Sequence, residues 1–531
     1  MRPPVVPFYP NSYFGAFVQD DWKARSNLTL NLGLRWEFDD VLGDASNLHP
    51  CASLTTVDNT CDYIVNILGK HEGRDFKQFG PRVGFAWDPL KRGQTVIRGG
   101  YGIYYDRVVT EVPLLQALLN GRILPLDAFG GSTCGGTSGG CSVPGATFDP
   151  GKPTLVNPFV GGGSPFGIGV NYIAHNAKHP YTQQFTLGLQ QQLGQNWVVS
   201  ADGLHDFGQR SILGRLLRST TSTSPFISCL DGFTPCEVVD PASGQSVASC
   251  FTASPASTCQ QITDIESAAK SWYDALLISL QKRPTGGPNF RWGFNVNYTL
   301  SRTFNYSNDD QIPFNGAEDA VNVLFRSNNL QLEKGYAPTD ERHRFVFYGL
   351  FNVPWNLTIS PIWTYSSHVP MDSQVPALGA RLPVIRRNAL GREISTGAQL
   401  NAAIDLWNSL PLCTGLNQVP CHSGGIVPHV DPNARFGDDF NSFDIRVTKT
   451  WKLFNERNSL QFIAEVFNLF NITNIRGFNN NNYSGFKNAI IPSQSNPLIA
   501  DPSFNQPIRT AGGFFGSGGP RAFQFALKYV F

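Results

Sequence analysis

The chain has 531 residues and a formal net charge of +1, with 41 Lys and Arg against 40 Asp and Glu. This balance gives no electrostatic case for a nucleic-acid partner or an acidic substrate. Charged residues make up only 15% of the sequence, below the roughly 25% of soluble domains, and no apolar run reaches the roughly 18 residues of a membrane-spanning helix.

Alternation of apolar and polar residues predicts about thirteen β-strands along the chain. In 28–38, for example, leucines and aromatic residues occupy every second position, with Thr, Asn, Gly, Arg and Glu between them. This period of two places one face of a strand in an apolar environment and the other in water. The predicted strands lie, in chain order, near residues 12–22, 28–38, 83–87, 97–105, 185–189, 197–201, 276–280, 290–300, 345–351, 357–363, 443–447, 460–466 and 523–531.

The length of the best strands distinguishes two all-β architectures. A soluble sandwich or propeller also alternates, but its strands average about 5–6 residues. The runs 28–38 and 290–300 are about twice that length and would rise roughly 27 Å at a tilt near 40°. Their apolar faces carry no charge, which in mid-membrane would cost about 2–4 kcal/mol. The sequence therefore predicts an all-β, antiparallel, transmembrane outer-membrane β-barrel.

The links between the strands alternate in length. Short links occupy 23–27, 88–94, 193–196, 283–289, 353–356 and 452–458, and long Gly/Pro/Asn-rich segments occupy 41–78, 108–180, 209–271, 304–341, 367–439 and 473–519. Outer-membrane barrels have short periplasmic turns and long extracellular loops. We therefore expect every long segment to lie on the extracellular side.

All ten cysteines fall in the long segments and form close pairs along the sequence. The pairs are Cys51 with Cys61, Cys134 with Cys141, Cys229 with Cys236, Cys250 with Cys259, and Cys413 with Cys421. This placement predicts five local disulfides that face an oxidising space, with the connectivity open in the segment that holds four cysteines. A zinc site is the poorer interpretation, because the spacings do not match C-x₂₋₄-C.

The strand count and the N-terminal sequence predict a partial barrel. The first predicted strand runs inward from the extracellular side, the last ends on the periplasmic side, and single-chain bacterial barrels have an even number of strands. Residues 1–15 lack the apolar core of a signal peptide. We expect residues 1–531 to be the C-terminal part of a longer protein.

Several motifs resemble TonB-dependent outer-membrane receptors, most closely the large Oar-like branch. They are SYFGAFVQDDWKARSNLTLNLGLRWEF (12–38), TVIRGGYGIYYDR (95–107), HPYTQQFTLGLQQQLGQNWVVSADGL (179–204) and LQFIAEVFNLFNITN (460–474). The resemblance runs in order over the chain apart from the long loops. It implies a barrel of roughly 22 strands in the outer membrane of a Gram-negative bacterium, with signal peptide, N-terminal domain, plug and first strands absent from this sequence.

The resemblance also implies a function, which is energised uptake of a small solute through TonB, acting on the missing N-terminal part. Siderophores, carbohydrates, peptides and cobalamin remain open as the solute. The alternative is a non-transporting surface protein for adhesion or assembly that presents disulfide-pinned loops. Neither interpretation requires a metal, an organic cofactor or a catalytic residue.

Three groups of residues are candidates for specific roles. The resemblance assigns the alternating C-terminal residues to recognition by the barrel-assembly machinery, which pairs with an exposed strand edge. These residues are Phe523, Phe525, Leu527, Tyr529 and Phe531. Polar positions opposite the apolar faces are candidates for solute contact in the lumen, namely Arg35, Glu37, Arg291, Asn295 and Asn297. Residues 340–344, DERHR, are expected to form a solvated charge network at the outer rim.

The cysteine pairs generate the first test. In isolated outer membranes, we expect the cysteines to resist alkylation by maleimide until a reductant is added, because a disulfide leaves no thiolate to react. Mass spectrometry of labelled peptides measures this. Ready labelling without reductant would remove the argument that these segments face an oxidising space.

Overall fold

The computed structural model describes the strands and part of the loops. The described residues are 11–42, 74–108, 112–113, 170–217, 238–239, 246–247, 262–287, 289–306, 320–321, 334–375, 380–381, 384–410, 427–453, 458–479, 483–484, 499–500, 503–512 and 517–531.

The five predicted disulfides lie outside the described residues, so the structure gives them no support and they stay a prediction. This holds for both members of every pair, which are Cys51 and Cys61, Cys134 and Cys141, Cys229 and Cys236, Cys250 and Cys259, and Cys413 and Cys421. Their sequence spacing and their place in the long segments are therefore the whole argument for pairing.

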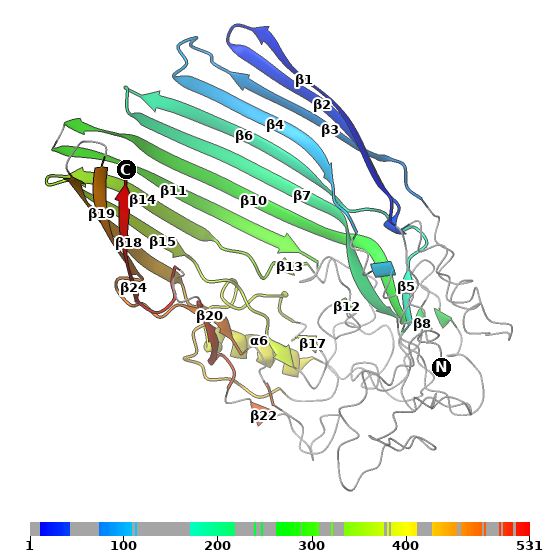
Figure 1. The fold of residues 1–531 in the computed structure, drawn as a ribbon. Coiled ribbons are helices and arrows are strands. Elements are labelled where there is room, and N and C mark those ends of the chain that lie inside the picture. The colour runs from blue at the N-terminus through cyan, green and yellow to red at the C-terminus, as the bar shows by residue number, and fades with distance from the viewer. Residues whose placement is uncertain are drawn as a thin grey trace, which may run out of the picture.

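One large antiparallel sheet dominates the described part of the chain (Figure 1), and it confirms the predicted fold class. Thirteen strands follow one another along it, one for each strand predicted from the sequence. In order they are β1 (Tyr13–Arg25), β2 (Leu28–Asp39), β3 (Gln78–Trp87), β4 (Thr95–Tyr105), β6 (Tyr181–Leu193), β7 (Trp197–Leu217), β10 (Ile262–Gly287), β11 (Phe290–Asn305), β14 (His343–Val353), β15 (Leu357–Ser366), β18 (Phe440–Leu453), β19 (Asn458–Phe467) and β24 (Ala522–Val530).

Short strands and one helix accompany the main sheet. β5 (Val170–Ile173), β12 (Ala320–Val321) and β13 (Gly335–Tyr336) pair with β10, β7 and β11. Four two-stranded ladders combine β8 (Val238–Val239) with β9 (Ser246–Val247), β16 (Gln374–Val375) with β17 (Ala380–Arg381), β20 (Ile475–Phe478) with β23 (Pro507–Thr510) and β21 (Tyr483–Ser484) with β22 (Ile499–Ala500). The helix is α6 (Gly397–Ser409). No helix of the described residues is long and apolar enough to cross a membrane.

The short links form tight connections at one end of the sheet, as the sequence predicts. β1 and β2 are separated by two residues and β6 and β7 by three. Asp88 stabilises the link between β3 and β4, because its side chain accepts hydrogen bonds from the N–H groups of Leu90 and Gly93. The helix α6, which belongs to the described part of a long connection, lies at the opposite end (Figure 1).

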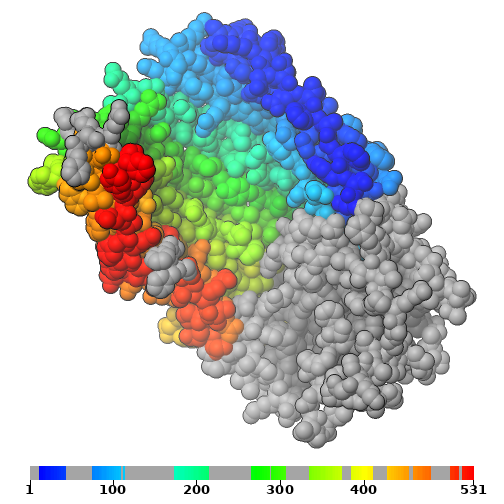
Figure 2. All heavy atoms as spheres, in the orientation of Figure 1, coloured from blue at the N-terminus to red at the C-terminus, as the bar shows by residue number. Residues whose placement is uncertain are grey.

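The apolar face of the sheet is uncovered in the described part of the chain. Phe185, Leu187 and Leu189 of β6 each expose about half of their side-chain surface. The buried hydrophobic clusters lie instead at the loop end, around α6 and around Val41, Ile212 and Ile265. Figure 2 shows the strands as a continuous surface from the blue N-terminal strands to the red C-terminal strand. The apolar faces therefore do not pack against a second sheet, as they would in a sandwich.

Aromatic residues mark two levels on the apolar face. At the short-turn end, Trp197 lies 6.3 Å from Trp292, and Lys282 Nζ lies 4.0 Å from the Trp292 ring. At the loop end, Phe207 stacks on Trp272 at 5.6 Å. Lys282 and Trp272 both belong to β10 and are ten residues apart, which at a tilt near 40° corresponds to about 25 Å along the membrane normal. This is about the height of the apolar band of an outer-membrane barrel.

The helix α6 was not predicted, because the sequence analysis treated 367–439 as a loop. Thr396 and Gln399 form a capping box, in which the Gln399 N–H donates to Thr396 Oγ1 and the Thr396 N–H donates to Gln399 Oε1. Reciprocal bonds of this kind satisfy donors at a helix N-terminus. Leu400, Ile404 and Trp407 then bury one face of the helix in a small core. We refer to residues 384–410 and 427–436 as the α6 module.

A buried ion pair joins the α6 module to the main sheet. Asp340 is fully buried, although residues 340–344 were expected to be solvated, and that expectation is wrong for this residue. Its carboxylate accepts a hydrogen bond from the Thr303 N–H at the end of β11 (2.6 Å) and another from Arg392 Nε (2.6 Å). Arg392 Nη2 also donates to the His368 carbonyl (2.8 Å).

Asp439 supplies a second polar link beside the first. Its Oδ1 accepts a hydrogen bond from the His368 N–H at 2.9 Å, and its Oδ2 accepts one from the Tyr365 hydroxyl at 2.7 Å. Burial by itself raises the pKa of Asp439, but these bonds and the His368 ring outweigh it and hold the pKa below its ordinary value. The linked carboxylate therefore stays ionised at neutral pH.

Removing the buried cation tests this attachment. We expect Arg392→Ala to weaken the docking of the α6 module by about 3–5 kcal/mol, because the Asp340 carboxylate would remain buried without its partner. Hydrogen exchange of the α6 amides measures the change. The control is Arg386→Ala, whose partly exposed pair with Glu393 (3.3 Å) should contribute less than about 1 kcal/mol. Equal protection of the α6 amides from exchange in Arg392→Ala and Arg386→Ala would contradict a docking role for the Asp340–Arg392 pair.

Candidate functional site

Two cross-strand rows of residues on the polar face of β1 to β6 build the candidate site. Strand register places Gln19, Gly33, Arg82, Gly102 and Gln184 side by side in the first row. The second row, one pleat closer to the short turns, contains Asp21, Asn31, Gly84, Gly100 and Thr186. In the first row, long polar side chains therefore alternate with glycines across five neighbouring strands, and in the second row two glycines lie side by side.

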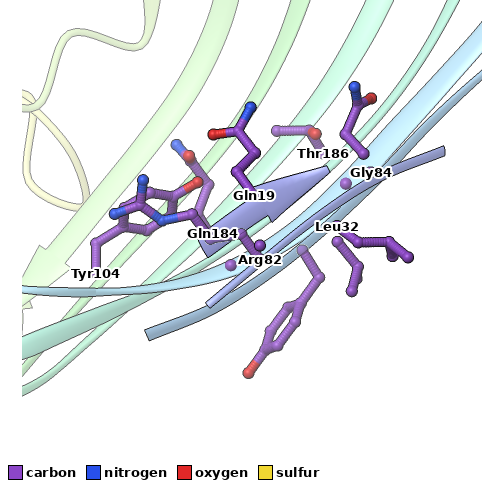
Figure 3. Close-up of a pocket in the computed structure, with 13 residues that line it drawn as sticks. Gln19, Leu32, Arg82, Gly84, Tyr104, Gln184 and Thr186 are labelled. Carbon is purple, nitrogen blue, oxygen red and sulfur yellow. The ribbon is translucent and has the colours of Figure 1, made fainter. Parts of the chain in front are cut away.

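The glycines leave a groove of about 230 Å³ between these polar side chains. In Figure 3, Gln19, Arg82, Tyr104, Gln184 and Thr186 project from one side of the strands. Leu32, which follows Asn31 in β2, points to the opposite side. The close-up thus shows the alternation that separates the polar face from the apolar face.

Gly102 has a specific steric role in the groove. A Cβ atom at this position would lie 2.8 Å from the ring of Tyr104. Real Cβ atoms essentially never come so close, so glycine allows the Tyr104 ring to lie flat over the strand. Gly84 is different, because a Cβ atom there would meet its nearest neighbour, the Gly99 carbonyl, at an ordinary 3.5 Å. A larger side chain at position 84 would enter the groove without displacing the backbone.

Arg82 is the cation of the groove, and its guanidinium lies over the ring of Tyr104 at 4.5 Å. Within the described residues, Arg82 has no carboxylate partner, whereas Asp21 accepts a hydrogen bond from the Asn31 amide (2.7 Å). The guanidinium presents up to five N–H donors in a plane. The groove therefore offers donors to an oxygen-rich solute and one positive charge to an anionic one.

The polar face beside the groove is fixed by ion pairs. Arg98 of β4 reaches across Gly188 of β6 to Asp202 of β7, with Nε–Oδ1 and Nη2–Oδ2 distances of 3.0 and 2.9 Å. A Cβ atom at position 188 would lie 1.9 Å from Asp202 Oδ1, so the pair depends on this glycine. Two parallel bonds of this type give a defined orientation as well as energy.

The five residues proposed from the sequence as lumen contacts all lie on the polar face, but apart from the groove. Arg35 Nε and Glu37 Oε1 form an ion pair, and the Tyr13 hydroxyl donates to Glu37 Oε1 at 2.7 Å. Arg291 Nε donates to the Pro284 carbonyl near the end of β10 (3.1 Å). Asn295 and Asn297 follow in β11, opposite Tyr348 and Val346 of β14. Their contact with a solute stays a proposal.

Four of the five C-terminal residues lie on one exposed face of β24, and Phe531 follows the strand directly. Phe523, Phe525, Leu527 and Tyr529 each expose more than half of their surface, and Phe531 exposes 91%. Among the described strands, β24 pairs only with β19, so its second edge is available. This placement is compatible with an assembly signal, which the structure does not test.

The described residues contain no group of three or more His, Cys, Asp or Glu that could hold a metal ion. Sequence reasoning missed Gln19, Asn31, Arg82, Tyr104, Gln184 and Thr186 as a group. The sequence nevertheless carried a signal for this group. Within 80–102, QFGPRVGFAW and TVIRGGYGIYY both place glycines repeatedly on the polar face, and glycines at neighbouring positions leave space between the strands' side chains.

The comparison with protein families agrees with this architecture. The outer membrane beta barrel domain family matches residues 5–358. Among solved structures, the outer membrane transporter YddB from Escherichia coli covers 98% of this chain and 45% of its own length, with 11% identity and a TM-score of 0.48. The alignment with the ferric enterobactin receptor PfeA from Pseudomonas aeruginosa covers 98% of this chain and 45% of the receptor, with 11% identity and a TM-score of 0.42.

The siderophore receptor PiuA from Acinetobacter baumannii gives 9% identity and a TM-score of 0.40 over 98% of this chain and 43% of its own. The chain thus spans less than half the length of these solved proteins. Comparison with curated proteins gives no match. On the family match, this chain belongs to the outer membrane beta barrel domain family and lies in the outer membrane of a Gram-negative bacterium.

Proposed function

We propose that this chain is the barrel part of a TonB-dependent receptor of the Oar-like branch, which takes up a small solute across the outer membrane. The observation that carries the proposal is the groove on the polar face of β1 to β6. The apolar face of an outer-membrane barrel meets lipid and the polar face lines the interior. A solute in this groove would therefore be inside the barrel.

The depth of the groove favours uptake over surface adhesion. Gly33 lies five residues along β2 from Leu28, at the short-turn end. This corresponds to about 13 Å along the membrane normal, near the middle of an apolar band about 25 Å tall. A protein partner that binds the extracellular loops would not reach this depth, whereas a small solute on its way across would.

The chemistry of the groove restricts the solute. Gln19, Asn31 and Gln184 offer amide donors and acceptors, Thr186 offers a hydroxyl, and Arg82 offers a positive charge. The ring of Tyr104 adds a flat apolar surface. This combination suits a neutral or anionic solute that is rich in hydroxyl or carbonyl oxygens, because each of these oxygens accepts from such donors.

The energised step rests on the sequence resemblance. In TonB-dependent receptors, a motor in the inner membrane acts through TonB on the N-terminal plug. On this proposal, residues 1–531 are the C-terminal part of the barrel domain, the role is non-enzymatic, and the interaction with TonB belongs to the N-terminal part. Arg35, Glu37, Arg291, Asn295 and Asn297 would line the remaining interior.

Blocking the groove tests the proposed function. We expect cells that carry the native gene to accumulate at least one of four labelled probes, which are ferric enterobactin, maltohexaose, a pentapeptide and cyanocobalamin. A protonophore should abolish this accumulation. Gly84→Leu should lower it by about tenfold, because a leucine side chain would fill much of a groove of this size and displace ligand contacts worth about 1.4 kcal/mol.

The matched control is Gly203→Leu, which adds the same side chain on the apolar face of β7, where the nearest atom to a Cβ is the Leu187 carbonyl at 3.7 Å. Its uptake should equal that of the wild type. Three results would contradict the proposal. They are accumulation of none of the probes, accumulation that does not depend on the proton gradient, and unchanged uptake in Gly84→Leu.

The terminal strand generates a separate prediction about assembly. We expect deletion of Phe531 to lower the amount of folded protein in the outer membrane severalfold, because the exposed edge of β24 would pair less well with the assembly machinery. Heat-modifiable mobility in gels of the outer-membrane fraction measures the folded form. Deletion of Gly512, in an exposed loop, is the control, and equal loss in both variants would count against a signal at the C-terminus.

A further inference from the structure

Three ionisable side chains lie in register on the apolar face of neighbouring strands. His205 of β7 is opposite Asp274 of β10, and Asp274 is opposite Arg302 of β11. His205 Nδ1 and Asp274 Oδ1 are 2.7 Å apart, and Arg302 Nη2 and Asp274 Oδ2 are 3.3 Å apart. Each side chain remains about half exposed, at 49%, 46% and 51%. We refer to these three residues as the lipid-face triad.

The triad lies on the membrane side of the outer aromatic level. Phe207 and Trp272 form the next cross-strand pair toward the extracellular end, two residues along each strand. A charge on the lipid face costs about 0–1 kcal/mol near the interface and about 2–4 kcal/mol at the midplane. The triad is thus at the outer edge of the apolar band, where a charged side chain is tolerated if it has a polar partner.

An open groove of about 580 Å³ begins at the triad and continues toward the membrane core. Its apolar walls are formed by Phe185, Leu187, Leu276 and Leu300. In the row below the triad, strand register places Gly203 between Leu187 and Leu276. Because Gly203 has no side chain, the surface is hollowed between the two leucines. This hollow has the width of one strand, which suits a hydrocarbon chain.

The charges around the groove are predominantly positive. Among the described residues that line it, Arg302 and Arg342 carry positive charge and Asp274 is the only acid. Arg342 lies 3.9 Å from Asp340, whose carboxylate already binds Arg392. Beside the groove, Lys334 Nζ lies 3.8 Å from the Trp272 ring, and burial, together with Arg386 and Arg302, lowers the pKa of Lys334. Arg386 and Arg302 thus place further positive charge beside the groove.

Arg302 retains hydrogen-bonding capacity. It donates to Asp274 through Nη2, and its guanidinium lies 5.3 Å from the Phe304 ring. A guanidinium carries five N–H donors, and within the described residues the other nitrogens of Arg302 have no acceptor. The fork of guanidinium donors matches the geometry of a phosphate as well as that of a carboxylate.

We propose that this groove binds a phosphorylated, acylated lipid of the outer leaflet. The phosphate accepts hydrogen bonds from Arg302 and meets the charge of Arg342, and one acyl chain lies over Gly203 between Leu187 and Leu276. A free anion would use only the charged end, and an uncharged lipid only the apolar end. The continuity of the two ends within one groove favours a single molecule that carries both.

Binding of lipid A to the purified full chain in detergent tests the proposal. The probe is hexa-acylated diphosphoryl lipid A, and native mass spectrometry measures the bound fraction in a titration. Arg302→Gln should weaken binding about tenfold, because it removes a charge-assisted hydrogen bond. Gly203→Leu should weaken it severalfold, because its side chain fills the hollow between the leucines.

Matched variants on the polar face provide the controls. Arg98→Gln removes the cation of a similar cross-strand Arg–Asp pair, and Gly84→Leu adds the same bulk inside the barrel. Both should bind lipid A like the wild type. Mobility shift on heating shows that each variant is folded before it is titrated.

Further binding measurements separate the contributions of the phosphate and of the acyl chains to the affinity for lipid A. Diacylglycerol, which has acyl chains but no phosphate, should bind at least about tenfold more weakly than lipid A, and millimolar inorganic phosphate should not displace lipid A. Equal binding of diacylglycerol would show that the groove recognises only acyl chains and would overturn the proposal. Displacement by phosphate, or unchanged affinity in Arg302→Gln, would overturn it as well. The assay contains no transported solute, so its outcome is independent of the proposed uptake.

Discussion

The structure depends on one constraint, which is that a chain crossing a bilayer must satisfy its own backbone hydrogen bonds and present apolar side chains to lipid. A continuous antiparallel sheet meets the first condition, and alternation along each strand meets the second. Thirteen strands in unbroken sequence obey both in the described part of the chain. The uncovered apolar face and the polar groove follow from the same alternation, seen from the two sides of the sheet.

Cross-strand register determines which side chains meet on each face. On the polar face, glycines between Gln19, Arg82 and Gln184 leave the groove in which we propose that a solute binds. On the apolar face, Gly203 and the lipid-face triad combine a hydrocarbon surface with charge. In both places a glycine removes a side chain from a row and the neighbouring residues supply the chemistry. The two sites are on opposite faces, so a substitution in one leaves the other intact.

The sequence predicted the strands because their period of two is a local signal. It did not predict the groove, since register brings together Gln19 and Gln184, which are far apart along the chain, and no single segment contains that information. The helix α6 had a signal in Thr396-x-x-Gln399 followed by spaced apolar residues, but the Gly/Pro-rich surroundings favoured a loop. The burial of Asp340 depends on Arg392, a partner that pattern alone cannot identify.

The most direct measurement is the solvent accessibility of spin labels, attached through a keto amino acid, on the two faces of one strand. In the folded protein in bilayers, labels replacing Leu32 and Leu187 should be relaxed by oxygen and shielded from a water-soluble nickel chelate. Labels replacing their neighbours Asn31 and Thr186 should show the opposite. Equal access of the nickel chelate to all four positions would contradict a sheet that separates lipid from a polar interior.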